Sequence, residues 1–223
     1  SVIFPGQGSQ LVGMGKDFHD KHTLVQDLFK EADETLGFSL SNLILNGPKE
    51  DLDLTENTQP AIFLISYSIF KLIKEEFNIN LNKANFFAGH SLGEYSALAS
   101  AGVLSFSDTL KILKIRGKAM QGSVPKGVGG MVAILGSEIE IIENFINENK
   151  TKYECFIAND NCVGQIVLSG NIEDLEKIMV DLKSANIKNI KLPVSAPFHC
   201  KLMNKATLVM NEEIAKLNFK ESE

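Results

Sequence analysis

The chain contains Gly89-His90-Ser91-Leu92-Gly93, and this G-x-S-x-G spacing restricts the possible folds more than any other feature. The spacing is informative only where a buried strand precedes it and a helix follows it. Residues 84–88 are short and apolar, and residues 94–101 favour a helix that ends before Gly102. The context therefore predicts a nucleophile elbow with Ser91 as the candidate nucleophile. The free N–H groups of the following helix could then stabilise an oxyanion.

Length and charge limit the alternatives. With 223 residues and 44% hydrophobic content, the chain is long enough for one large domain, or for one domain that carries a smaller lobe. A formal net charge of −6 argues against nucleic acid as the main partner. No segment is apolar enough over a sufficient length to predict a membrane span. The three cysteines form no C-x-x-C pair and favour a reducing, cytoplasm-like compartment, and no metal site is predicted.

The first half of the chain reads as an α/β domain. Residues 2–5 predict a buried strand, followed by a glycine-containing loop at Gly6–Gln10 that is either a ligand-binding edge or a plain turn. Residues 15–45 predict helices, and Asn57–Pro60 predict the start of another helix, with Gln59 at its entrance. That helix carries an apolar stripe that we expect to face the core, formed by Ile62, Ile65, Ile69, Leu72 and Ile73.

A further helix is predicted from Ser105 to Gln121. Arg116 lies three residues after Leu113 and four before Met120, so all three share one face. An arginine in an apolar stripe either has an anionic partner or extends its head group to water, and the spacing alone leaves both readings open. The same helix carries a basic line on another face, made of Lys111, Lys114 and Lys118.

Residues 127–192 change in pattern to strand, helix, strand, strand, helix and strand. This order predicts a split β-α-β-β-α-β unit of the ferredoxin-like kind. We therefore expect a hydrolase-like parallel-sheet α/β core formed by residues 1–124 and 194–223, with an inserted ferredoxin-like lobe at 125–193.

His199 follows a small-residue loop where the chain re-enters the predicted core. A serine nucleophile needs a base, and His199 is the best placed of the four histidines, although a structural role would fit the same position. His90 is a weaker candidate because adjacent side chains on an elbow point apart.

At this point the chain resembles a known family, the malonyl-CoA:acyl-carrier-protein transacylases of fatty-acid synthesis. The matching segments occur in the family's order and span nearly the whole chain. They are Phe4-Pro-Gly-Gln-Gly-Ser-Gln10, Thr58-Gln59-Pro60-Ala61, Gly89-His-Ser-Leu-Gly-Glu94, Arg116-Gly117 with Met120-Gln121, Asn159-x-Asn161-x-x-Gly164-Gln165, and Leu192-Pro-Val-Ser-Ala-Pro-Phe-His199.

The resemblance implies a malonyl-serine ester on Ser91 formed in a ping-pong reaction. His199 would act as the general base and acid, and the backbone N–H groups of Gln7 and Leu92 would form the oxyanion hole. It implies a coenzyme A thioester as substrate and no cofactor or metal.

The resemblance also implies the groups that select the substrate. Arg116 would bind the malonyl carboxylate, with Gln59, Met120 and Phe198 lining the pocket. Phe198 would limit the space beside the malonyl methylene and so favour malonyl over methylmalonyl.

The implied partners are malonyl-CoA and acyl carrier protein, with no nucleic acid or membrane. We expect the protein to be a monomer. We expect it in the cytoplasm, or in the stroma or matrix of an organelle of bacterial origin. The three lysines are the predicted docking surface for the acidic carrier. Members of this family continue past the position of Glu223, and a later main-chain carbonyl orients their histidine, so we expect that group beyond this sequence. A serine thioesterase or esterase and a non-catalytic carrier-docking scaffold are the alternative readings.

Overall fold

The structure is a computed structural model of residues 1–223. It describes every residue except 126, 195 and 223, and at residue 82 it describes the backbone but not the side chain. One position of the predicted histidine segment, residue 195, therefore lies outside the described residues. The chain divides into two compact units, which we describe separately. Unit 1 comprises Ser1–Lys118 and Met210–Glu223, and unit 2 comprises Ala119–Val209.

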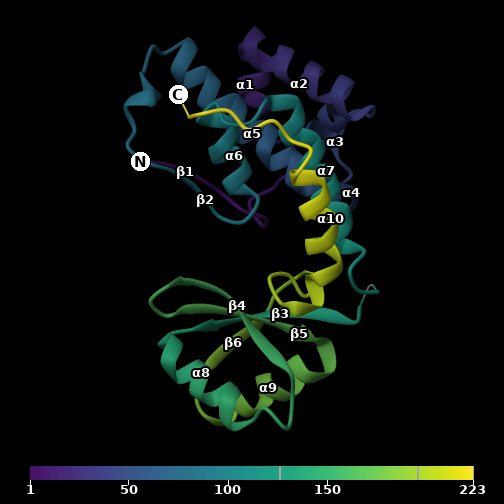
Figure 1. Ribbon diagram of the computed structural model, residues 1–223, viewed down its shortest axis with the longest axis vertical. Coiled ribbons are helices and arrows are strands. Elements are labelled where there is room, and N and C mark those ends of the chain that lie inside the picture. Colours follow the sequence, from purple (N-terminus) through teal and green to yellow (C-terminus); the bar gives the residue numbers. More distant parts are fainter. Residues whose placement is uncertain (126, 195, 223) are drawn as a thin grey trace. The chain divides into compact units, whose positions relative to one another are not determined.

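Unit 1 contains a parallel pair of short strands. β1 (Val2–Phe4) pairs with β2 (Phe87–Gly89), with Phe4 opposite Gly89. A parallel pair requires a long crossover connection, and here it is helical. The connection contains α1 (Lys16–Lys21), α2 (Thr23–Leu36), α3 (Leu40–Asn46), α4 (Lys49–Leu52), α5 (Thr55–Glu75) and the 3₁₀ turn η1 (Leu81–Lys83) (Figure 1).

Two helices follow β2. α6 (Gly93–Ser100) begins at the predicted elbow, and α7 (Phe106–Gln121) begins one residue after Ser105. The Ser105 hydroxyl accepts a hydrogen bond from the Asp108 N–H at 3.0 Å and donates one to its carboxylate at 2.7 Å. This reciprocal cap explains why the helix starts where the sequence predicts.

Helix α5 forms the centre of the unit 1 core. Its Ala61, Phe63 and Leu64 side chains are fully buried. The helix begins at Thr55, two residues before the predicted start, because the N–H groups of Asn57 and Thr58 already bond to the Leu54 carbonyl at 2.7 and 2.8 Å.

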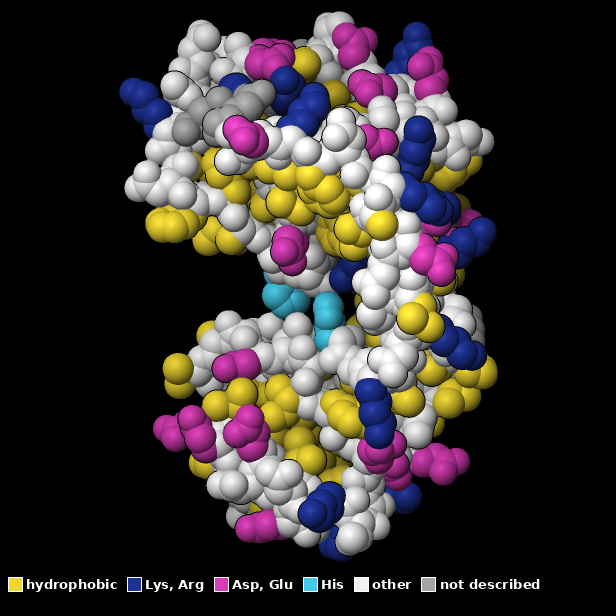
Figure 2. Space-filling view, viewed as in Figure 1, with side chains coloured by type: hydrophobic (Ala, Val, Ile, Leu, Met, Phe, Trp, Pro, Cys, Tyr) yellow, Lys and Arg dark blue, Asp and Glu magenta, His cyan; other side chains and the backbone are white. Residues whose placement is uncertain are grey.

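The predicted apolar stripe of α5 is only partly correct. Ile62 and Leu72 are buried, whereas Ile65, Ile69 and Ile73 are only partly buried and line an apolar pocket next to β1. Large apolar side chains of unit 1 are also exposed, and hydrophobic groups reach its surface on the face shown in Figure 2. Helical spacing identifies a common face but not what covers it, which is why the stripe was over-assigned to the core.

Unit 2 contains a four-stranded antiparallel sheet. Its strands are β3 (Gly129–Leu135), β4 (Cys155–Cys162), β5 (Gln165–Asn171) and β6 (Lys188–Lys191), in the spatial order β4-β5-β3-β6. α8 (Ile139–Glu148) follows β3 and α9 (Ile172–Ser184) follows β5. The apolar residues of both helices pack on one sheet face in a single core cluster. This order and pairing confirm the predicted ferredoxin-like unit.

After β6 the chain reaches the 3₁₀ turn η2 (Lys201–Met203) and α10 (Asn204–Ile214). The chain passes from one compact unit to the other between residues 118 and 119 and between residues 209 and 210. The predicted domain boundaries at 124/125 and 193/194 were placed at the ends of the strand–helix pattern, whereas the two units are defined by their compactness. The predicted boundaries stay a prediction. Among the helices that the structure describes, none has the length and apolar character that a bilayer crossing requires.

Candidate active site

Ser91 occupies the predicted strand–turn–helix junction. Its φ angle is +54°, a left-handed conformation that non-glycine residues rarely adopt. The His90 N–H donates to the Phe4 carbonyl at 3.1 Å, and the Gly93 N–H donates to the His90 carbonyl at 2.9 Å. These bonds tie the turn to the end of β1, so the strain at Ser91 is held by the surrounding structure.

Two side chains from distant helices converge on Ser91. Arg116 on α7 donates from Nη2 to Ser91 Oγ at 3.0 Å and from Nη1 to Gln59 Oε1 at 2.8 Å. Gln59 on α5 is only 1% exposed. The close approach of α7 to α5 depends on Gly117, because a Cβ there would lie 2.5 Å from both Glu56 Cα and the Thr55 carbonyl oxygen. Unit 1 therefore brings Ser91, Arg116 and Gln59 together.

The charge of Arg116 is not balanced by a direct acidic contact. Within the described part of the chain its side-chain contacts are neutral: the Gln59 amide, the Ser91 hydroxyl and the Tyr95 ring, whose centroid is 5.7 Å from Cζ. Burial lowers the pKa of Arg116, while Tyr95 and, more weakly, Glu94 act in the opposite direction. A half-buried guanidinium that lies beside Ser91 and is held by neutral groups is suited to accept an anion.

The loop after β1 lies against the elbow. A Cβ on Gly6 would lie 2.4 Å from His90 Nδ1, and the loop is tied to the start of α5 by a 3.3 Å bond from Gln7 Nε2 to Thr55 Oγ1. Among the residues described, the N–H groups of Gln7 and Leu92 donate to no other backbone group. The predicted oxyanion donors thus come from two segments that both adjoin Ser91. Their joint action on a substrate oxygen is a proposal.

The predicted base and the other predicted pocket residues belong to unit 2. His199 is exposed and has a positive φ of +57°. Phe198 and Met120 are buried in one apolar cluster with Met131 and Ala196. Ser91 belongs to unit 1 and His199 to unit 2, and their pairing stays a prediction.

The predicted docking lysines differ in their surroundings. Lys111 and Lys118 are exposed. Lys114 is half-buried, donates to Asn57 Oδ1 at 2.7 Å and lies 4.6 Å from the centre of the Phe38 ring. Burial lowers the pKa of Lys114. Only Lys111 and Lys118 are therefore presented to solvent in the manner that a docking surface requires.

One contact of the site was missed by the sequence reading. Residues 94–101 predict only a helix, yet the Tyr95 ring lies against the Arg116 guanidinium, with Cζ 5.7 Å from the ring centroid. The available signal was its position in the first turn of the helix that follows the elbow. In the described residues, no group of three or more His, Cys, Asp or Glu side chains has an arrangement that could hold a metal ion.

The parallel strand pair, the elbow and the strained serine beside the Arg116 guanidinium are features of an α/β protein in which a serine is the candidate nucleophile. Within this class, the family model described as "Acyl transferase domain" matches residues 2–223. The chain belongs to the acyl transferase domain family.

Relatives and solved structures agree with this assignment. The chain is 42% identical over 207 residues to the Haemophilus influenzae protein named malonyl CoA-acyl carrier protein transacylase. This alignment covers 92% of the chain and 66% of that relative. It matches the crystal structure of the Bartonella henselae acyl-carrier-protein S-malonyltransferase with a TM-score of 0.94 and 39% identity, covering 100% of this chain and 71% of that one. The chain thus spans about two thirds of the length of these proteins.

A third match is a solved complex. Its description is a type II PKS acyl-carrier protein in complex with its malonyl-transacylase. The match has a TM-score of 0.91 and 37% identity, and it covers 98% of this chain and 70% of the other.

Proposed function

We propose that this protein transfers the malonyl group from malonyl-CoA to the phosphopantetheine thiol of acyl carrier protein through a malonyl ester of Ser91. The names of the relatives support the two substrates. The observation that carries the proposal within this chain is the Arg116 guanidinium, which bonds to Ser91 Oγ at 3.0 Å and whose side-chain contacts among the described residues are neutral.

The first half-reaction forms the ester. Ser91 Oγ attacks the thioester carbonyl as His199 takes the hydroxyl proton, and the N–H groups of Gln7 and Leu92 bind the oxyanion. Collapse of this intermediate breaks the C–S bond, and His199 returns the proton to the departing thiolate. In the second half the carrier thiol attacks the ester with His199 again as base, and Ser91 recovers its proton.

Arg116 supplies the substrate selectivity. A malonyl carboxylate would pair with the guanidinium, with Gln59 fixing its orientation from the other side. An acetyl group would leave the half-buried cation without an anion, at a cost of several kcal/mol. Phe198 and Met120 would limit the space at the acyl group, which favours malonyl over methylmalonyl.

Arg116 also distinguishes a malonyl transferase from the alternative functions. A serine thioesterase or esterase would use an elbow and a histidine but has no need of a cation at Ser91 Oγ. A docking scaffold has no need of the strained serine. We further propose that the protein acts as a monomer without a cofactor, in the cytoplasm or in an organelle of bacterial origin.

Intact-mass analysis after brief incubation with malonyl-CoA or acetyl-CoA tests the proposal. A malonyl adduct that is lost in Ser91→Ala, and a preference that moves from malonyl to acetyl by about tenfold or more in Arg116→Ala, are the expected results. Rapid release of free malonate without an adduct would identify a thioesterase instead. Because the relatives are longer, a chain extended to their length is the form to use.

A further inference from the structure

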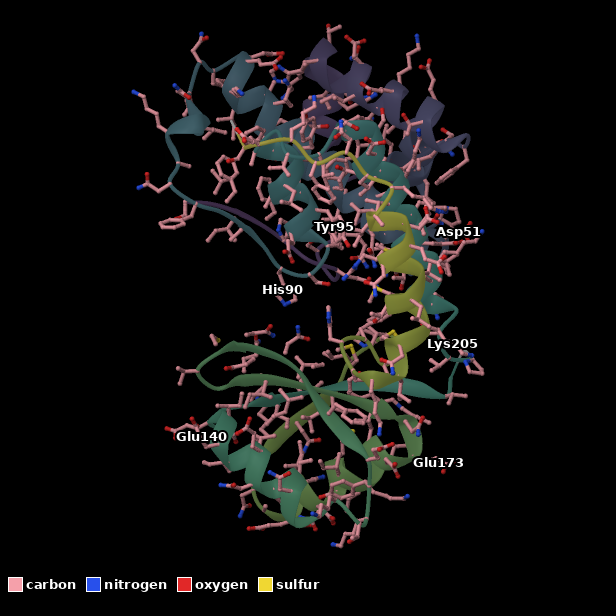
Figure 3. The ribbon with its side chains drawn as sticks, in the orientation of Figure 1. Asp51, His90, Tyr95, Glu140, Glu173 and Lys205 are labelled. Atoms are coloured by element: carbon pink, nitrogen blue, oxygen red, sulfur yellow. The ribbon has the colours of Figure 1, made fainter. Side chains whose placement is uncertain are left out.

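Tyr95 meets the guanidinium from the same helix that begins at the nucleophile. It lies in the first turn of α6 (Figure 3). Its N–H bonds to the Leu92 carbonyl at 3.1 Å. The Arg116 Cζ lies over its ring at 5.7 Å from the centroid, within the range of a cation–π contact. The ring is half-buried and packs against the main core cluster of unit 1.

This contact completes a set of neutral groups around Arg116. Gln59 holds Nη1 and Ser91 holds Nη2, so these two bonds fix the outer nitrogens. The Tyr95 ring, over which Cζ lies, is a third contact that limits movement of the guanidinium without supplying a charge that would compete with a substrate carboxylate. Glu94, the adjacent acidic residue, is exposed and is the weakest of the groups that act on Arg116.

We propose that Tyr95 is a positioning residue that holds the Arg116 guanidinium in the orientation that accepts a substrate carboxylate, and that it thereby contributes to the selection of malonyl over acetyl thioesters. The inference rests on the proposed function and extends it to a residue that does not touch the reacting atoms. A tyrosine suits this task because its ring attracts the cation while its hydroxyl provides a polar end at a half-buried site.

The test compares the rates of Ser91 acylation by malonyl-CoA and acetyl-CoA in Tyr95→Leu and Tyr95→Phe. Tyr95→Leu should lower the malonyl rate by about tenfold and change the acetyl rate by less than about twofold. Tyr95→Phe keeps the ring and should lose only about threefold for malonyl. In the Arg116→Ala background, Tyr95→Leu should have no further effect on the malonyl rate, because the group that it positions is gone.

Tyr67→Leu is the matched control. Tyr67 on α5 packs against the same core cluster, but its ring contacts are with Phe63, Phe70 and Phe106. Its loss should lower stability without changing the malonyl-to-acetyl ratio. If Tyr95→Leu lowers both rates equally, as this control would on unfolding, the positioning role is overturned and Tyr95 is only a core residue.

A titration separates failure of this inference from failure of the proposed function. The chain has only three tyrosines, so Tyr67→Phe with Tyr153→Phe leaves Tyr95 as the sole phenol. Adding Arg116→Ala should raise its pKa, because the nearby cation lowers the pKa of Tyr95 against the effect of burial. An unchanged pKa would overturn the contact itself, whether or not the wild type forms a malonyl adduct. No adduct in the wild type, together with a raised pKa, would overturn the proposed function and the selectivity role but leave the contact.

Discussion

A single missing side chain at position 117 controls where the guanidinium lies. Gly117 faces the first turn of α5, and Arg116 beside it reaches Gln59, four residues after Thr55. The backbone of α5 cannot move aside as a flexible side chain could. The placement of Arg116 at Ser91 therefore depends on a residue that takes no part in the chemistry.

Gly117→Ala tests this dependence. The new methyl group would lie 2.5 Å from backbone atoms of Thr55 and Glu56, so α7 must shift or the chain must lose stability. We expect a loss of about 1–3 kcal/mol in the free energy of unfolding, and a larger loss of malonyl than of acetyl transfer to Ser91. Urea denaturation and the intact-mass assay measure the two effects. Lys118→Ala on the exposed side of the same helix is the control, and equal stability of both variants would refute the close approach.

At the scale of helices and strands, the sequence predicted the type of each element better than the contacts that its side chains make. The elbow, the helix start at Ser105 and the sequence of strands and helices in the ferredoxin-like unit follow from local rules, and the structure confirms them. Periodicity alone could not identify the partners of Arg116, because it gives the direction of a side chain on its own helix and not what meets it; only the family resemblance placed Gln59 in the same pocket. Its contacts come from residues 57 and 25 positions earlier in the chain. The role of Tyr95 was missed for the same reason.

The pH dependence of unit 2 follows from its core. Burial raises the pKa of the Cys155 thiol from 9.0 to about 12 and that of the Tyr153 phenol from 10.0 to about 12. The unfolded chain then loses these protons at a lower pH than the folded unit does. Their contribution to stability is therefore complete below about pH 9 and is lost as the pH rises toward about 12.

Urea-unfolding midpoints measured by circular dichroism between pH 8 and pH 11 should fall, and the fall should be smaller in Cys155→Val, in which the buried ionisable group is absent. Cys162→Val is the control because Cys162 is exposed on the same strand. An identical pH profile for wild type and Cys155→Val would contradict the assignment.

At the scale of the whole molecule, charge restricts how the partner can dock. The chain carries a net charge of −6, and the proposed carrier is acidic, so the two molecules repel unless a local basic surface meets the carrier. On α7 the exposed cations are Lys111 and Lys118, since Lys114 is engaged by Asn57 and Phe38. We therefore restrict the proposed docking contribution to the two exposed lysines.

Reversal of both charges, in Lys111→Glu with Lys118→Glu, should raise the KM for acyl carrier protein by about tenfold at low salt and by less at high salt, because exposed charges act at long range and are screened. The rate of Ser91 loading from malonyl-CoA should change by less than about twofold, since neither lysine contacts Ser91, Arg116 or Gln59 through a described bond.

Lys21→Glu with Lys30→Glu is the control, because it changes the net charge by the same amount on α1 and α2, away from α7 in sequence. If this control raises the carrier KM as much, net charge rather than a docking surface governs the encounter. If carrier transfer and loading from coenzyme A fall together, the two lysines support the fold of α7 and the docking surface lies elsewhere.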